Sequence, residues 1–206
     1  MGSAQHADDT AALLDGLGLR DVLVFGGSAG GIVALQLALR YPRLIRRSIA
    51  FEPGYFRQVP GGEARVLPAN QAMEAHLVSH PGDWAGAYAA FGRAVAPTAA
   101  SSPRGYFTAP TAMDWYTERE DGNADALVRD DIPILTQELV DETALASAAP
   151  DIRFSFGANS LSIFREITTH LAAIRGAVPD AIQGVGHSIY YYPDAAATYI
   201  RSQSER

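Results

Sequence analysis

The chain contains no cysteine, which excludes disulfide bonds, thiolate nucleophiles and cysteine-ligated metal sites, and fits a reducing compartment. It also has no apolar run of the roughly 20 residues that a membrane-spanning helix needs. Basic residues are outnumbered, with 16 Lys and Arg against 23 Asp and Glu and a formal net charge of −7. Because these basic residues form no local run, we expect no nucleic-acid-binding surface.

The first residues, Met1 to Asp9, carry acidic side chains where a secretory signal would need basic and then apolar ones. Together with the absence of cysteine, this pattern predicts a cytoplasmic protein that binds neither nucleic acid nor a membrane.

What the chain does have is a hydrophobic content of 48% over 206 residues, typical of a soluble globular protein with a sizeable core. We expect one domain with an insertion. Its first core part is predicted at residues 1–53, a helical lid at 54–150, and a second core part at 151–206.

One glycine-rich stretch organises this prediction. The apolar run at 22–25 leads into Gly-Gly-Ser-Ala-Gly-Gly at 26–31, and an apolar helix follows. Gly26, Ser28 and Gly30 have the Gly-x-Ser-x-Gly spacing of a nucleophile elbow, a sharp turn that lifts a serine hydroxyl above the end of a sheet. The motif predicts a serine hydrolase with Ser28 as its nucleophile.

Two other interpretations of this stretch are weaker. Ser28 could simply cap the following helix, as serines before helices often do. A glycine-rich turn between strand and helix can also bind phosphate, and Glu52 mimics the ribose-binding acid of dinucleotide sites. However, a P-loop needs a lysine that this turn lacks, and the dinucleotide motif needs glycine where Ser28 stands.

The remaining pattern indicates an α/β fold with a mostly parallel sheet of about four strands. The predicted strands lie near 21–25, 46–51, 152–156 and 181–185. The predicted helices lie near 6–17, 30–41, 162–175 and from Pro193 onward. The first strand, helix and strand form a βαβ unit, whose crossover is almost always right-handed.

Within the lid, four apolar side chains recur at helical spacing: Trp84, Tyr88, Phe91 and Val95. We interpret this stripe as packing rather than as a cofactor site. Residues 96–110 are typical of a loop, and 123–140 are typical of a helix with a break at Pro133.

His187 is the candidate general base. Of the five histidines, only this one follows a terminal strand through a Gly-x-Gly turn, which would direct it back over the sheet edge. We interpret the other four as ordinary surface or core histidines. From this position His187 could take the proton of Ser28 and return it to a leaving group.

These segments resemble the α/β-hydrolase fold superfamily. The matching pieces are residues 6–18, the Gly-Gly-Ser-Ala-Gly-Gly turn, Ala50-Phe51-Glu52-Pro53, and Gly184-Val185-Gly186-His187 with Pro193. The resemblance covers both ends of the chain well and the lid poorly. It implies an esterase-like serine hydrolase with a helical lid and no metal or organic cofactor.

Two residues compete for the third position of a catalytic triad. Superfamily members usually place an aspartate after the penultimate strand, where this chain has Asn159. An amide can orient an imidazole, but it supplies no charge to stabilise an imidazolium. Other members carry the acid after the strand that follows the elbow helix, where Glu52 stands. We place Glu52 ahead of Asn159.

The resemblance also implies an incomplete oxyanion hole. Ala29 supplies the backbone N–H that follows the nucleophile, but the loop that donates the second N–H belongs to strands that would precede residue 21. We therefore expect a fold truncated at its N-terminus, with an exposed sheet edge through which two copies could form a homodimer.

The sequence thus predicts hydrolysis of a carboxylic ester or a similar small acyl substrate by Ser28, His187 and Glu52, with activity reduced or lost through the missing strands. The alternative is a non-catalytic protein that keeps the fold as a binding scaffold.

Overall fold

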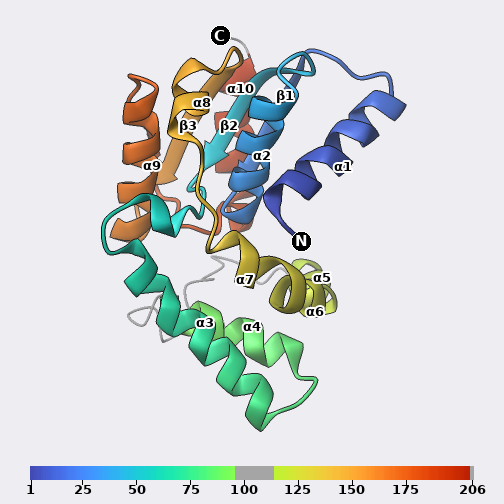
Figure 1. Ribbon diagram of the computed structural model, residues 1–206, viewed down its shortest axis with the longest axis vertical. Coiled ribbons are helices and arrows are strands. Elements are labelled where there is room, and N and C mark those ends of the chain that lie inside the picture. Colours follow the sequence, from blue (N-terminus) through green and yellow to red (C-terminus); the bar gives the residue numbers. More distant parts are fainter. Residues whose placement is uncertain (96–113, 205–206) are drawn as a thin grey trace.

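Four parallel strands form one sheet in the computed structural model, in the order β1-β2-β3-β4 (Figure 1). The strands are β1 (Val22–Gly27), β2 (Ile45–Phe51), β3 (Asp151–Gly157) and β4 (Asp180–Ile182). The structure describes residues 1–95 and 114–204. The predicted α/β fold and its four strands are confirmed.

The last strand is shorter than predicted. The apolar pattern predicts a strand that extends to residue 185, but β4 ends at Ile182. Gly184 adopts φ = +73°, in the left-handed region that a strand cannot continue through. The chain therefore turns earlier than its apolar pattern indicates, and the segment leading to His187 is a loop.

Helices cover both faces of the sheet. The helices of the core are α1 (Ser3–Gly16), α2 (Ala29–Arg40), α9 (Ser162–Ile174) and α10 (Pro193–Ser204). Each lies within a few residues of its predicted range. One hydrophobic cluster contains residues of α1, α2 and α9, whereas a second gathers α10 against Phe51 and Ile182. Helix α10 therefore packs on the opposite face of the sheet from α2 and α9 (Figure 1).

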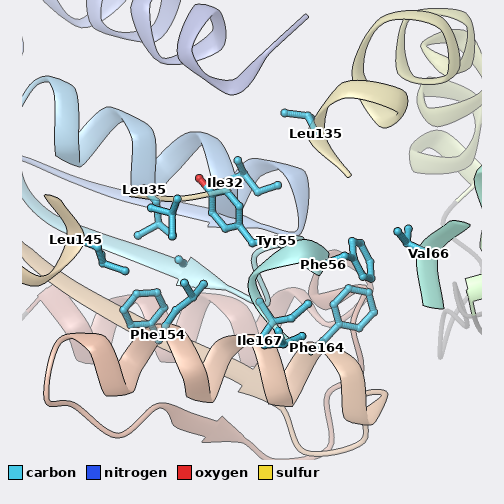
Figure 2. Close-up of a cluster of buried hydrophobic side chains, with 14 of the residues drawn as sticks. Ile32, Leu35, Tyr55, Phe56, Val66, Leu135, Leu145, Phe154, Phe164 and Ile167 are labelled. Atoms are coloured by element: carbon cyan, nitrogen blue, oxygen red, sulfur yellow. The ribbon is translucent and has the colours of Figure 1, made fainter. Parts of the chain in front are cut away.

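The larger cluster lies between α2, the sheet and α9, and continues toward the lid helices (Figure 2). Leu35 of α2, Phe154 of β3 and Ile167 of α9 are all buried in it. Each such side chain contributes about 1.5–3 kcal/mol on removal from water, so this cluster supplies much of the folding free energy.

A helical region lies beyond the carboxyl ends of the strands (Figure 1). It comprises η1 (Phe56–Gln58), α3 (Gly62–Ser79), α4 (Trp84–Val95), α5 (Asp114–Gly122), α6 (Ala124–Ala126), η3 (Leu127–Asp131) and α7 (Ile132–Leu135). Helix α8 (Glu142–Ser147) then leads back to β3. We call the part from η1 to α7 the lid; the boundaries of 54–150 stay a prediction.

The regular helix is interrupted near Pro133, as predicted, but the interruption lies in the turn before the proline. Residues Leu127–Asp131 form the π-helical turn η3, and Pro133 lies in the first turn of α7. Proline has no N–H for the carbonyl four residues earlier, so the regular helical hydrogen bonding fails in this preceding turn. The predicted loop at 96–110 lies outside the described residues.

Strand β1 pairs only with β2 within the described part of the chain. Nearby, Leu13 and Leu17, in and just after α1, are 61% and 62% exposed. Whether a second copy pairs with this edge stays a prediction. Among the residues that the structure describes, no helix is both long and apolar enough to cross a membrane.

Candidate functional site

Ser28 occupies the turn between the end of β1 and the start of α2. Its backbone has φ = 54° and ψ = −119°, a combination that L-residues rarely adopt and that is held only when the surroundings enforce it. The start of α2 packs closely against the end of β1 and enforces this backbone conformation. A Cβ on Gly26 would lie 2.0 Å from the carbonyl oxygen of Gly30, so only glycine lets the helix approach the strand here.

The side chain of Ser28 makes no capping hydrogen bond to α2, although Ser28 is the residue that precedes the helix. Its backbone N–H instead donates to the carbonyl of Phe51 of β2 at 2.9 Å. This geometry argues against the helix-cap interpretation of Ser28. Ala29 begins α2, whose N-terminal N–H groups favour a negatively charged oxygen nearby.

Glu52 lies directly after β2, and its side chain is fully buried. It too has a positive φ, 45°, which turns the chain sharply at the strand end. One carboxylate oxygen accepts the N–H of Gly157 at 2.7 Å, and the other accepts the hydroxyl of Ser160 at 2.7 Å. A buried carboxylate needs such partners, and these donors come from the end of β3 and the loop after it.

His187 completes this buried group of side chains. Its Nδ1 atom lies 2.5 Å from Oε2 of Glu52, and its ring stacks on Phe164 with centroids 3.7 Å apart. These two contacts fix the imidazole in place and in rotation. With Nδ1 bonded to Glu52, Nε2 is the ring nitrogen directed away from the carboxylate.

Ser28 and His187 both line one cavity of about 730 Å³. Ala29 lies on its wall beside them, and Arg119 and Asn123 contribute polar side chains from the lid. The structure therefore brings Ser28, Ala29, Glu52 and His187 to the same end of the sheet, as their positions in the sequence led us to expect for a site. The roles of these residues in catalysis stay predictions.

Asn159, the alternative third residue, lies apart from this contact. Its side chain is exposed, and its backbone N–H donates to the carbonyl of Val185 at 3.0 Å. The neighbouring Ser160 is the residue of this loop whose side chain reaches Glu52. The geometry therefore favours Glu52 over Asn159 as the partner of His187.

Tyr190 is a site residue that the sequence motifs did not point to. Its hydroxyl accepts the backbone N–H of Gly27 and donates to the carbonyl of the same residue, both at 3.1 Å. Desolvation raises the pKa of Tyr190, with the Gly27 hydrogen bond opposing it, so the hydroxyl keeps its proton. Tyr190 thus bonds both backbone groups of the residue before Ser28. Its only sequence signal was proximity to His187.

Two aromatic residues of the lid stripe, Tyr88 and Phe91, also lie at the candidate site. Phe91 is buried, consistent with packing, but Tyr88 and Phe91 also line a smaller cavity that reaches Ser28. Helical spacing alone could not show this, since it depends on where α4 lies over the sheet.

A parallel sheet carries a strained serine at the turn between β1 and α2, and a buried acid–histidine pair lies at the same end of the sheet. The protein is therefore an α/β protein whose candidate site lies at the turn between a strand and the following helix. A family model described as alpha/beta hydrolase fold matches residues 1–132. The chain belongs to the alpha/beta hydrolase fold family.

Solved structures with this fold resemble most of the chain. One is described as Est816, an N-acyl homoserine lactone degrading enzyme; it is 22% identical with a TM-score of 0.60, over 98% of this chain and 74% of that one. A second is the putative non-heme bromoperoxidase BpoC of Mycobacterium tuberculosis H37Rv, 14% identical with a TM-score of 0.66, over 98% and 73%.

A third structure comes from a description of carboxylesterases of the thaumarchaeon Nitrososphaera gargenis, 14% identical with a TM-score of 0.65. The match covers all of this chain and 74% of that one. Hydrolases and esterases are thus among the structural neighbours. Because the sequences are only 14–22% identical, this similarity shows a shared fold and no shared activity.

A curated relative matches only a short segment. Homoserine O-acetyltransferase of Thermus thermophilus is 49% identical over 39 residues, which is 19% of this chain and 10% of the acetyltransferase. The match spans far less than two thirds of that enzyme.

Proposed function

We propose that this chain hydrolyses a carboxylic ester or a similar small acyl substrate through an acyl-enzyme on Ser28. The observation that carries this proposal is the 2.5 Å contact between His187 and the buried Glu52, together with the cavity that Ser28 and His187 both line. An imidazole held by a carboxylate, beside a serine at a strained turn, is the arrangement that activates a hydroxyl nucleophile.

In the first half of the reaction, Oγ of Ser28 attacks the carbonyl carbon and its proton passes to Nε2 of His187. The carboxylate of Glu52 stabilises the imidazolium that forms. The N–H of Ala29 donates to the carbonyl oxygen as it becomes negative. The alcohol then leaves with the proton of His187.

In the second half, His187 takes a proton from a water molecule, which attacks the acyl carbon and releases the acid. Ser28 recovers its proton from the imidazolium. Apart from this water molecule, the steps as proposed use only side chains and the backbone N–H of Ala29.

The alternative function, a binding scaffold without catalysis, is favoured by one observation. Residues Ser3–Gly16 ahead of β1 form helix α1, so these residues provide no loop N–H beside that of Ala29. Loss of one oxyanion donor typically costs about a hundred- to a thousandfold in turnover. A site in which Ala29 is the sole oxyanion donor is expected to hydrolyse esters more slowly by this factor.

Covalent labelling separates the two functions. We expect a fluorophosphonate probe to label the folded protein at Ser28, detected by intact mass and peptide mapping, and Ser28→Ala to abolish the label. His187→Ala should slow labelling strongly while circular dichroism stays unchanged. A folded protein whose Ser28 stays unlabelled would support the scaffold and overturn the hydrolase.

A further inference from the structure

Two cavities meet at Ser28, and their walls differ. The larger, of about 730 Å³, is lined in part by Arg119 and Asn123, which are exposed to solvent. The smaller, of about 90 Å³, is lined by Ser28 and Ala29 together with side chains of both the core and the lid. A substrate held at Ser28 therefore has a large side with a few exposed polar groups and a small side walled mainly by carbon.

The closed cavity has an apolar wall. Its buried apolar side chains come from α2, η1, α4, α7 and α9: Ile32, Phe56, Phe91, Leu135 and Phe164. Figure 2 shows Phe56 beside Phe164, whose ring centroids are 5.7 Å apart, with Ile32 and Leu135 toward α2 and the lid. Phe164 also stacks on His187, so the cavity and the histidine share a wall.

The polar groups on this wall already have partners. Oδ1 of Asp131 lies 3.0 Å from Nε2 of His6. The hydroxyl of Thr136 donates to the carbonyl of Ile132 at 2.7 Å. A ligand in this cavity therefore meets mostly carbon, and a polar group there would lose its bonds to water without replacement.

We propose that the smaller cavity receives the acyl side chain of the substrate, and that this side chain is a short aliphatic group. A dry apolar cavity of about 150 Å³ accommodates benzene, so a cavity of about 90 Å³ accommodates about three or four carbon atoms. The inference rests on the proposed function, because it places the carbonyl carbon at Ser28.

The order of the two reaction steps decides which cavity holds the acyl group and which holds the alcohol. The acyl group stays bound to Ser28 until water arrives, so it suits a closed cavity that holds it in place. The alcohol must depart after the first step, so it suits the larger cavity with its exposed wall. The substrate class is therefore an ester of a short-chain carboxylic acid with a larger alcohol.

A series of p-nitrophenyl esters with acyl chains of increasing length tests how long a chain the smaller cavity accommodates. Each methylene transferred from water into an apolar site increases kcat/KM about fourfold. We expect kcat/KM to rise about fifteenfold from acetate to butanoate, and to fall at least about tenfold from butanoate to octanoate, because the remaining carbons have no room.

Three variants test whether the smaller cavity sets how kcat/KM depends on acyl chain length. Phe91→Ala removes a ring from the wall and should move the optimum to hexanoate or octanoate. Met73→Ala is the matched control, since Met73 of α3 is also buried in the lid and does not line either cavity. Leu135→Ala is a second enlarging variant for use if Phe91→Ala fails to fold.

The outcomes separate this inference from the proposed function. Hydrolysis with a flat profile, or a profile unmoved in both enlarging variants, would overturn the cavity assignment while leaving Ser28 as nucleophile. Absence of both hydrolysis and fluorophosphonate labelling would overturn the two together. A butanoate optimum that shifts in Phe91→Ala but not in Met73→Ala would establish the assignment.

Discussion

Nδ1 of His187 and Oε2 of Glu52 lie 2.5 Å apart although 135 residues separate them in the chain. Both side chains are almost completely buried, at 4% and 0% exposed. Glu52 also accepts hydrogen bonds from Gly157 and Ser160, so three chain segments meet at its carboxylate. This arrangement fixes the imidazole and leads to the first prediction.

Glu52→Gln should reduce ester hydrolysis strongly. The amide keeps the size of the side chain and one acceptor oxygen, but it removes the charge that stabilises the imidazolium of His187. In a serine–histidine–acid site the equivalent change lowers kcat by about ten-thousandfold. Steady-state kinetics with p-nitrophenyl butanoate measure the effect, and thermal unfolding checks that the variant is folded.

Asn159→Ala is the matched control for this experiment. Because Asn159 is exposed and its backbone rather than its side chain bonds to Val185, we expect turnover to change less than about threefold, or about 0.6 kcal/mol. The reverse result, with Asn159→Ala inactive and Glu52→Gln active, would make Asn159 the partner of His187 in catalysis.

The second prediction concerns Tyr190 and Gly27. Tyr190→Phe removes the hydroxyl that bonds both backbone groups of Gly27, and should lower the free energy of unfolding by about 1–2 kcal/mol. Urea unfolding at 25 °C measures this change. Tyr192→Phe, two residues along, is the control and should change stability by less than half as much.

Gly27→Ala should be destabilising for a related reason. A Cβ at this position would lie 2.6 Å from the hydroxyl oxygen of Tyr190, so the tyrosine must move. The cost should be smaller in the Tyr190→Phe background, where the oxygen is absent. Equal costs in both backgrounds would show that the two residues are not coupled.

A third prediction follows from the buried Arg47. Its guanidinium donates to Asp151 at 2.7 Å and also to the backbone of Gln203. Burial acts to raise the pKa of Asp151, but hydrogen bonds from Arg153 and Arg47 outweigh it, and the net pKa is lowered. A lowered folded-state pKa means that the ionised form stabilises the fold.

The stability that Asp151 contributes is therefore present above about pH 4, the pKa of an unfolded aspartate, and is lost as the pH falls through the lower folded-state pKa. The carboxylate of Asp151 is 36% exposed, so solvent screens its charge; Asp151→Asn should cost about 1–2 kcal/mol at pH 7, and the difference from wild type should shrink toward about pH 3. Asp15→Asn, at an exposed ion pair with Arg20, should cost less than about 1 kcal/mol. A pH-independent cost of Asp151→Asn would refute the role of its charge.

The fourth prediction concerns the edge of β1. An exposed strand edge readily pairs with another strand, and we expect two copies of this chain to associate there. Sedimentation equilibrium over a range of about 1 to 100 µM should give the mass of two chains. Leu23→Lys in β1 should shift the mass to one chain, whereas Val178→Lys, on an exposed residue elsewhere, should not. A single-chain mass at every concentration would contradict this prediction.

Much of the fold could be predicted because its signals are local. The apolar run of β1, the glycines around Ser28 and the periodicity of α9 each specify an element through neighbouring residues alone. The predicted end of the last strand, at residue 185, is wrong: the apolar pattern continues past Gly184, but the backbone turns there at a positive φ and β4 ends at Ile182.

The candidate site was only partly predictable. Ser28 lies in a motif whose spacing is itself the signal, and His187 and Glu52 could be proposed from their positions after strands. Sequence alone left Glu52 and Asn159 as rivals, because both follow predicted strands that end at the same edge of the sheet. Packing distinguishes them: only the folded chain shows which side chain turns inward.

The sequence by itself therefore determined the parallel sheet, the serine at the strand–helix turn and the exclusion of thiol chemistry, since each depends on residues close together or on composition. Tertiary structure alone decided the contact of His187 with Glu52, the bond from Tyr190 to Gly27 and the closed apolar cavity beside Ser28. These features join residues more than 100 positions apart, and their geometry depends on how helices of the core and the lid pack around one end of the sheet.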